Sequence, residues 1–416
     1  MNWAEASRRP EPDLSGLKVL HIAPTPFFSD RGCHIRILSI LRAIETRGGT
    51  NVLCTYPLGR DVSGVGTHRI SAVPGYENTE AGPQKGKLRA DLMLLILCLR
   101  TALKEKPDLI HAHLHEGLLI GWLVRILLPW KRLVLVADLQ GGLVGELDDH
   151  GFFSRRSITP GLLRFCFRAL EACLLKLPAH IFCSSGNSEQ IFRIDYGIKL
   201  DRITRLDDRV DLSAYDPARV SLSVSPFPKD AFVAIYSGSL LPIKGLEVLK
   251  ELILTVTGRR HDICFLLLGY PTAEMEAFIA EHQISAQVAL TGRIAFESLP
   301  GYLLLANAGI EPKRSVSGEG SGKLLHYMAA GLALAAFPTE HNLSFAGADA
   351  LATGNTPADL ARRIEMLADD RALCRTAGRA NRDQARAYSL EDGGETIAGI
   401  YQALGLTLGQ QDARGG

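Results

Sequence analysis

Short buried strands alternate with helical segments along this chain, and the pattern begins twice. Leu17–Ala23 and Ala231–Gly238 are apolar runs that each end in a turn. Each precedes a segment with the 3.6-residue periodicity of a helix, Ile35–Thr46 and Gly245–Thr257. Parallel strands need such crossover helices, which cover both faces of the sheet. The pattern therefore predicts an α/β protein with two doubly wound, Rossmann-like domains.

Further apolar runs continue the alternation in both halves of the chain. They are Asp108–His111, Leu133–Val136, His180–Cys183, Cys264–Leu268, Val288–Leu290 and Ala308–Ile310. A stretch rich in Pro and Ser separates the halves. We predict an N-terminal domain over 1–213, a linker over 214–230, a C-terminal domain over 231–387, a helix over 388–404 that packs back on the N-terminal domain, and a flexible tail over 405–416. Ligands of such sheets bind beyond the carboxyl ends of the strands, so we expect the two domains to face a cleft.

The overall charge excludes one class of partner. There are 46 Lys+Arg against 45 Asp+Glu, a net charge of +1, whereas a dedicated nucleic-acid binder is usually strongly basic. Residues 1–15 contain no apolar signal core, and the best apolar run, Gly117–Trp130, is shorter than the roughly 20 residues of a membrane-spanning helix. These features predict a cytoplasmic protein.

One segment of the N-terminal half suggests contact with a membrane surface. Basic residues alternate there with apolar ones, at Arg155, Arg156, Arg164, Arg168 and Lys176. A basic amphipathic helix can lie on an anionic bilayer, which predicts a peripheral location at the inner membrane face. The alternative is a core helix with solvated arginines.

Several nucleotide and metal motifs are absent or broken. Neither opening strand leads into GxGxxG, which disfavours a dehydrogenase. Ser317–Leu324 resembles a P-loop, but Ser317 and Leu324 break the Walker pattern. The eight cysteines form no CxxC pair, and the alternating His111, His113 and His115 have no outside cluster, so we predict no metal site.

Two anion-binding segments remain in the second half. A Gly-rich loop opens into the helix Lys323–Ala330, whose first N–H groups together with Lys323 would bind an anion. Lys244 lies where another helix begins, a position that is unfavourable for a cation unless an anion sits between them. Glu319 would repel phosphate but could face the hydroxyl groups of a sugar. The alternatives are a flexible loop and an ordinary surface lysine.

Ordered motifs over about 17–404 resemble the GT-B glycosyltransferases of the family 4 type, which are retaining enzymes that use nucleotide-sugar donors. The segments that carry the resemblance are Pro26–Gly32, Lys106–His113, His180–Ser185, Asp208–Leu212 with Tyr215 and Pro217, Ser237–Gly245 and Gly318–Gly331. Each motif alone is weak evidence for the family, whereas the order and spacing of all of them together are strong evidence.

The resemblance implies a role for individual residues. His113 would contact the donor sugar, Lys244 would neutralise the leaving diphosphate, and Glu319 completes the catalytic set. The donor would be bound by Gly32, Ser239, Lys244, Arg293, Gly318, Glu319, Gly320, Ser321, Gly322, Lys323, Leu324 and His326. The acceptor side would be formed by Asp138, Gln140 and Gly141, which we expect in the Gly-rich loop Asp138–Glu146. A UDP- or GDP-sugar would be the co-substrate, with no tightly bound cofactor and no metal.

The implied activity is transfer of a hexose to a hydroxyl group of a sugar, a lipid-linked or a small-molecule acceptor, in glycolipid, polysaccharide or glycoconjugate biosynthesis. The chain departs from the family pattern at three donor positions. Ser239 replaces an arginine, and Gly318 and His326 replace two glutamates. The alternatives are therefore a catalytically lapsed GT-B domain that serves as a binding or scaffold subunit, and a nucleotide-sugar epimerase or phosphorylase of the same architecture.

Overall fold

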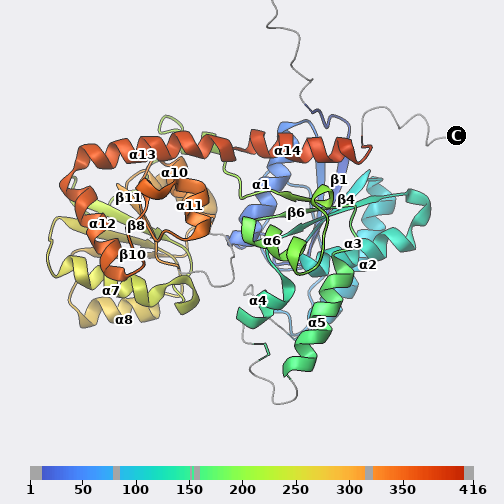
Figure 1. Ribbon diagram of the computed structural model, residues 1–416, viewed down its shortest axis with the longest axis horizontal. Coiled ribbons are helices and arrows are strands. Elements are labelled where there is room, and N and C mark those ends of the chain that lie inside the picture. Colours follow the sequence, from blue (N-terminus) through green and yellow to red (C-terminus); the bar gives the residue numbers. More distant parts are fainter. Residues whose placement is uncertain (1–11, 78–84, 150–151, 154–159, 314–321, 407–416) are drawn as a thin grey trace, which may run out of the picture. The chain divides into compact units, whose positions relative to one another are not determined.

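The structure, a computed structural model, describes residues 12–77, 85–149, 152–153, 160–313 and 322–406 (Figure 1). Its described residues form two compact units. The first runs to Asp207 and takes up the C-terminal segment from Leu390, and the second runs from Asp208 to Ser389. Each unit is built on one parallel sheet. The predicted α/β class with two doubly wound units is confirmed.

The first unit contains a seven-stranded sheet in the order β3-β2-β1-β4-β5-β6-β7, in which all neighbours are parallel. Its strands are β1 (Lys18–Ala23), β2 (Thr50–Thr55), β3 (Thr67–Arg69), β4 (Leu109–His113), β5 (Val134–Leu139), β6 (His180–Cys183) and β7 (Ile203–Arg205). Its helices are α1 (Gly32–Thr46), α2 (Lys87–Glu105), α3 (Leu114–Leu127), α4 (Leu143–Asp149), α5 (Pro160–Leu174), α6 (Gly186–Ile194) and α14 (Leu390–Ala403).

The second unit contains a five-stranded parallel sheet in the order β10-β9-β8-β11-β12. Its strands are β8 (Phe232–Ser237), β9 (Ile263–Leu268), β10 (Val288–Gly292), β11 (Ala308–Glu311) and β12 (Ala333–Ala336). Its helices are α7 (Leu246–Thr257), α8 (Ala273–Glu281), α9 (Leu299–Leu303), α10 (Lys323–Ala329), α11 (Glu340–Ala346), α12 (Pro357–Asp369) and α13 (Arg371–Ala385).

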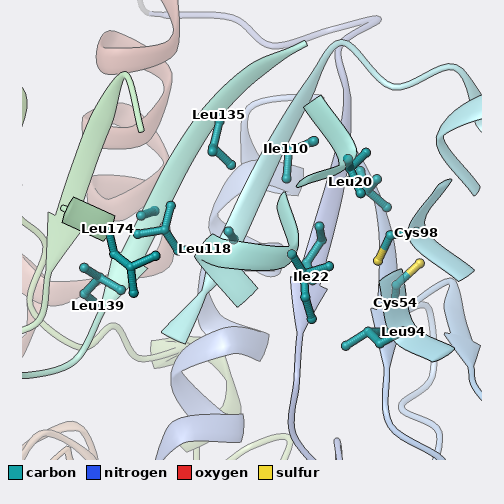
Figure 2. Packing of buried hydrophobic residues seen from close by; sticks show 14 of the residues in the cluster. Leu20, Ile22, Cys54, Leu94, Cys98, Ile110, Leu118, Leu135, Leu139 and Leu174 are labelled. Carbon is teal, nitrogen blue, oxygen red and sulfur yellow. The ribbon is translucent and has the colours of Figure 1, made fainter. Parts of the chain in front are cut away.

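The first sheet separates two buried layers. Alternate residues of a strand point to opposite faces, so Leu20 and Ile22 of β1 join one core with Leu94 of α2 and Leu118 of α3 (Figure 2). Residues of the other parity, such as Val19, pack under α1 and α14 in a second core. Helices α2, α3 and α5 thus cover one face, and α1 and α14 cover the other.

Two differences from the sequence prediction affect the site. The strand expected to end at His111 continues to His113, and Asp138, expected in a Gly-rich loop, lies inside β5. The apolar run Leu133–Val136 suggested that the strand ended before Asp138, because an aspartate is unfavourable in a buried strand. A buried arginine partner, described below, makes its position tolerable.

The described residues contain no helix long and apolar enough to cross a membrane.

Alanine substitutions at two glycines of α14 test how closely this helix packs on α1. A Cβ at Gly394 would lie 2.4 Å from the Ala43 carbonyl oxygen, whereas a Cβ at Gly399 would meet nothing within 4 Å. We expect Gly394→Ala to lower the free energy of unfolding of the first unit by about 1–3 kcal/mol through overpacking. Gly399→Ala should leave it unchanged or raise it by up to about 1 kcal/mol, since alanine favours helices. Denaturant titration of both variants checks this, and equal stabilities would contradict the close packing.

Candidate active site

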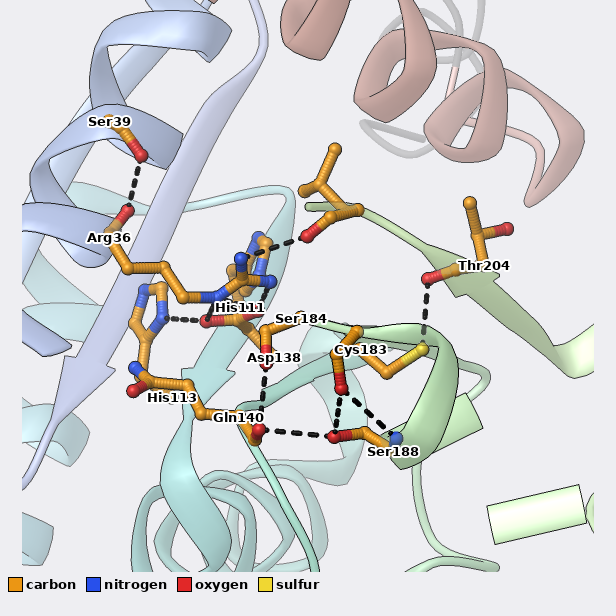
Figure 3. A network of polar contacts seen from close by, with 12 residues as sticks. Arg36, Ser39, His111, His113, Asp138, Gln140, Cys183, Ser184, Ser188 and Thr204 are labelled. Carbon is orange, nitrogen blue, oxygen red and sulfur yellow. Dashed lines mark hydrogen bonds and ion pairs between the residues drawn. The ribbon is translucent and has the colours of Figure 1, made fainter. Parts of the chain in front are cut away.

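A polar network lies under α1 and α14 at the carboxyl half of the first sheet (Figure 3). His21 pairs in register with His111 of the neighbouring strand, and His113 pairs with Asp138. These four residues share the parity that points toward α1 and α14. All four side chains have no exposed surface. The sheet therefore collects three imidazoles and one carboxylate in one buried layer.

The carboxylate is held by an arginine from α1. Arg36 Nη2 lies 2.6 Å from Asp138 Oδ1, and Arg36 Nε donates a second bond to the same carboxylate. A third bond runs from Arg36 Nη1 to the Leu206 carbonyl at 2.8 Å. Burial alone would raise the pKa of Asp138. The Arg36 guanidinium and His113 lower this pKa by more than burial raises it, so the net pKa lies well below its ordinary value. Asp138 stays ionised in the interior.

Both ring nitrogens of His113 are engaged within this layer. Nδ1 lies 3.2 Å from Asp138 Oδ2, and Nε2 lies 3.0 Å from Nδ1 of His21. The His113 ring is fully buried, and both of its nitrogens have partners within the protein, so its contact with a donor sugar stays a prediction. Asp138 on the predicted acceptor side is also fully buried, and its oxygens are bound by Arg36 and His113.

The remaining histidines of the layer stack on one another. The ring centroid of His111 lies 5.2 Å from that of His21 and 4.9 Å from that of His113, and His111 Nδ1 shares a 2.7 Å hydrogen bond with the Tyr401 hydroxyl of α14. Burial lowers the pKa of His21 and of His111 well below the ordinary value. His21 and Arg36 were missed by the sequence analysis, although each is a polar residue at an inward position of an apolar pattern.

The segment after β5 is more open. The Gln140 carbonyl accepts hydrogen bonds from the Ser184 hydroxyl at 2.7 Å and the Ser188 hydroxyl at 3.1 Å (Figure 3). The Gln140 Nε2 atom is buried and has no hydrogen-bond partner among the described residues. A Cβ at Gly141 would meet nothing within 4 Å. The buried, unpartnered amide of Gln140 and the space beside Gly141 are the features of this segment that bear on the predicted acceptor side.

The segment between β1 and α1 is fixed by His34. Its Nδ1 accepts hydrogen bonds from the Ser29 backbone N–H at 3.0 Å and from the Ser29 hydroxyl at 3.1 Å, and its Nε2 lies 2.5 Å from the Thr25 hydroxyl. Burial lowers the pKa of His34 to about 3, so the ring stays neutral and Nδ1 remains an acceptor. Gly32, assigned to donor binding, is exposed at the first position of α1.

In the second unit, the side chain of Lys323 extends from α10 to the end of β8. Its Nζ lies 3.5 Å from Glu311 Oε2 and 4.4 Å from the ring centroid of Tyr236. A Cβ at Gly238 would lie 3.1 Å from the same Nζ. Burial lowers the pKa of Lys323, but Glu311 and the neighbouring tyrosines raise it more, so the net pKa is above its ordinary value. Glu311 and Tyr236 were not among the predicted site residues.

The other predicted lysine site, at Lys244, also lies in the second unit. Lys244 ends a short 3₁₀ turn, Pro242–Lys244, and is half-buried. The next residue, Gly245, has φ +89°, and a Cβ there would lie 2.6 Å from the Pro312 carbonyl oxygen. The segments that follow β8 and β11 are therefore in contact. Ser239, in the place of the family arginine, is half-buried, and its carbonyl accepts a 2.8 Å hydrogen bond from the Tyr236 hydroxyl.

The start of α10 has a negative neighbour. A Cβ at Gly322 would lie 2.5 Å from Asp208 Oδ2, so a carboxylate packs beside the first turn of this helix. The predicted anion site formed by the N–H groups of Gly322, Lys323 and Leu324 thus already has an anionic partner nearby. The Leu324 side chain is fully buried in the core.

Two further predicted donor residues are placed by aromatic contacts. The Arg293 guanidinium lies 3.9 Å from the ring centroid of Tyr270, just beyond the ends of β10 and β9. His326 Nδ1 shares a 2.8 Å hydrogen bond with the Tyr215 hydroxyl, and its ring packs on Phe296. Burial lowers the pKa of His326 to about 4, although Asp208 raises it. His326 is therefore neutral at pH 7.

Four predicted residues, Gly318, Glu319, Gly320 and Ser321, lie outside the described residues. Within the described ranges, no group of three or more His, Cys, Asp or Glu side chains is arranged to hold a metal ion.

Part of the second unit matches a known family. Residues 231–370 match the family described as "Glycosyl transferases group 1". The alpha-D-kanosaminyltransferase of Streptomyces kanamyceticus is 28% identical over 184 residues, which cover 42% of this chain and 47% of that enzyme. The chain thus matches about half the length of this curated relative.

Solved structures show the same two-unit architecture over nearly the whole chain. Sucrose-phosphate synthase from Thermosynechococcus elongatus has a TM-score of 0.73 at 17% identity, covering 93% of this chain and 99% of that one. HepE of Anabaena, solved in complex with UDP and glucose, has a TM-score of 0.69 at 16% identity, covering 93% and 100%.

These likenesses define the fold of the chain and the family that part of it matches. The two parallel sheets with their helices form the GT-B fold, which solved glycosyltransferase structures share. The match to the group 1 glycosyltransferase family covers residues 231–370. The resemblance inferred from the sequence motifs is confirmed at the level of fold and family.

The neutral state of His34 predicts a pH dependence of stability. Its folded pKa of about 3 lies below the ordinary value of 6.5, so its contribution is complete above pH 6.5 and is lost as the pH falls toward 3. The loss amounts to about 1.4 kcal/mol per pH unit. Denaturant titrations between pH 8 and pH 5 should show a smaller slope for His34→Gln than for the wild type. Any loss at pH 8 measures packing alone, and identical slopes would contradict the assignment.

Proposed function

We propose that this protein is a retaining glycosyltransferase that transfers a hexose from a UDP- or GDP-sugar to an acceptor hydroxyl group. The observation that carries the proposal is the position of Lys323. Its ammonium group lies beside Gly238 at the carboxyl end of β8, in the unit that matches the glycosyltransferase family. Ligands of parallel sheets bind at this edge of the sheet.

The reaction breaks the bond between the anomeric carbon and the diphosphate oxygen, and forms a bond from that carbon to the acceptor oxygen. The leaving nucleoside diphosphate takes the bonding electron pair, and the acceptor hydroxyl loses a proton. Negative charge therefore grows on the diphosphate as the bond breaks. Fixed cations near that oxygen stabilise the transition state more than the ground state. Lys244 and Lys323 are the two residues to which we assign this role.

Lys323 supplies a cation where the family arginine is missing. Ser239 offers no charge, and its carbonyl is bound by Tyr236. Lys323 Nζ reaches the adjacent residue, Gly238, from another helix. Because Glu311 keeps the pKa of Lys323 raised, the ammonium stays charged despite its burial. We infer that a lysine from α10 takes over the charge of the absent arginine.

The remaining assignments follow from the placements above. We assign His113 a positioning role, since its ring is bonded to Asp138 and His21. Gln140 and Gly141 are proposed for the acceptor side. Gly32, Arg293 and His326 are kept as donor contacts, as are Glu319 and its neighbours Gly318, Gly320 and Ser321. The acceptor is proposed to be a sugar, a lipid-linked molecule or a small molecule, in the synthesis of a glycolipid, polysaccharide or other glycoconjugate.

A screen of nucleotide sugars tests the proposed function against its alternatives. Thermal stability and slow donor hydrolysis are measured with UDP-, GDP- and ADP-sugars. Stabilisation by one class of sugar nucleotide, with slow release of the nucleoside diphosphate, supports a transferase. Epimerised donor without release supports an epimerase. Stabilisation without any turnover indicates a lapsed binding domain, and no response to any nucleotide contradicts the proposal.

The two lysines can be tested separately. Removing one fixed transition-state charge costs about 10²–10³-fold in kcat, so we expect that loss for Lys244→Ala and for Lys323→Ala. Lys323→Arg should recover part of the rate, because the charge is restored. Lys229→Ala, which removes an exposed lysine near the start of β8, is the matched control and should leave kcat unchanged. Wild-type rates in both alanine variants would refute the assigned diphosphate site.

A further inference from the structure

Three neighbouring helices of the first unit form one outer surface. Leu94 of α2, Leu118 of α3 and Leu174 of α5 all join the same core, so the three helices cover the same face of the sheet. Helix α3 packs beside both α2 and α5 (Figure 1). The sides of these helices that point away from the sheet therefore lie on one side of the unit. We call them, with residues 129–132 after α3, the outer helix surface.

The outer side of α2 is apolar although it faces solvent. Its large exposed residues are Leu88, Leu92, Ile96 and Leu103, and Leu88 is 84% exposed. The first three are spaced by four residues, which places them on one stripe of the helix. Buried residues such as Leu94 and Cys98 form the opposite stripe, toward the core. Helix α2 thus has two apolar sides, and only one of them is covered within the unit.

The other two helices extend the exposed apolar surface. Leu119, Ile126 and Leu127 of α3 are exposed, and Trp130 in the following turn is 66% exposed. On α5, the exposed large residues are Leu162, Phe165 and Leu170, and Phe165 is 68% exposed. Isolated exposed apolar residues are normal, but so many on adjacent helices are typical of an interaction surface.

The exposed charged residues of this surface are mostly cations. They lie between the apolar residues, at Arg89, Arg100, Lys104, Arg132, Arg164 and Arg168. Arg164 is paired with Asp148 of α4. The described acids of α2, α3 and α5 are buried or half-buried, although the Glu116 side chain keeps 38% of its surface exposed. Each of these acids has a partner within the unit: Tyr56 for Asp91, Lys18 for Glu105, Lys87 for Glu116 and Tyr196 for Glu171.

We propose that the outer helix surface docks on an anionic lipid membrane. Apolar side chains that stand out between cations can enter the acyl boundary while the cations contact anionic headgroups. An exposed tryptophan is favoured at the same depth of a bilayer. A second copy of this chain fits less well, because a two-fold contact would place cations against cations, and the acids of the three helices are already bonded within the unit. The protein would thereby be held peripherally at the membrane.

This inference goes beyond the proposed transfer reaction and does not depend on it. None of the residues of the surface belongs to the proposed donor or acceptor site. A protein that binds vesicles but hydrolyses no donor would therefore refute the transferase alone, and the reverse outcome would refute the membrane surface alone.

Vesicle binding by the full chain tests the proposal. The probes are vesicles of phosphatidylcholine alone and of phosphatidylcholine with phosphatidylglycerol, and binding is measured by co-sedimentation. The apolar variant combines Leu88→Ser, Leu92→Ser and Ile96→Ser. The charge variant combines Arg89→Gln, Arg100→Gln and Lys104→Gln. The matched control combines Leu222→Ser and Val224→Ser, which alter exposed apolar residues outside the three helices. Thermal unfolding and donor hydrolysis of each variant check that the fold is kept.

The expected results differ between the variants. The wild type and the control should bind the phosphatidylglycerol vesicles, and added salt should weaken that binding. The apolar variant should lose about tenfold or more on both vesicle types. The charge variant should lose about a hundredfold on the anionic vesicles only, at roughly fivefold per residue.

Three outcomes would overturn the proposal. The first is that the wild type does not bind the vesicles at low salt. The second is that the apolar variant binds them as tightly as the wild type. The third is that the wild type is a dimer in solution and the apolar variant is a monomer. The last result would reassign the outer helix surface to an interface between two copies of the chain.

Discussion

The buried ion pair between Arg36 and Asp138 is the interaction on which the arrangement of the first unit depends. Their side chains are 3% and 0% exposed, so each charge lacks water and needs the other. Removing one partner of such a pair usually costs about 3–5 kcal/mol, because the remaining charge stays buried. The pair therefore fixes α1 over β5, and through the bond to Leu206 it also fixes the segment after β7. His113 is oriented by the same carboxylate. Through these bonds, the ion pair fixes the positions of α1, of the sheet and of the His113 ring relative to one another.

Sequence reasoning predicted the fold class and family because the alternation of strands and helices is a local pattern. It failed where a partner came from far away in the chain. Asp138 was expected in a loop because its partner, Arg36, belongs to another helix. The sequence also does not reveal that His21 and Asp138 are the partners of the two ring nitrogens of His113. The strands β2, β3 and β7 were not predicted, since they are short or half-buried. The short strand β12 was not predicted either, although it is apolar and fully buried. Lys323 was predicted for its place at a helix start, but the sequence does not reveal that its ammonium group reaches Gly238.

In the proposed donor site of the second unit, a charge is kept although the residue that supplies it changes. A charge near a reacting group acts through its position, and the element that supplies it is secondary. Lys323 approaches the end of β8 from α10, while the residue that follows Gly238 in sequence is a serine. Glu311 makes this possible, because it compensates the burial of the ammonium. A departure from a family motif is therefore weak evidence for lost activity until the spatial neighbours of the changed position are known.

The position of α14 in the chain has a consequence for how the protein is made. This helix completes the layer over the first sheet, where Tyr401 contacts His111, yet it follows the whole second unit in sequence. Translation proceeds from the N-terminus, so the apolar face that α14 covers stays open until α14 has emerged from the ribosome. The second unit, by contrast, is contiguous in sequence and can form its sheet earlier. Its two ends are joined by hydrogen bonding between Val210 and Tyr388, which closes the inserted unit at its base. Nascent chains stalled before Leu390 would therefore expose the apolar residues of β1 and α1 that α14 covers. Chaperones that recognise apolar surface can bind these residues until α14 has been synthesised.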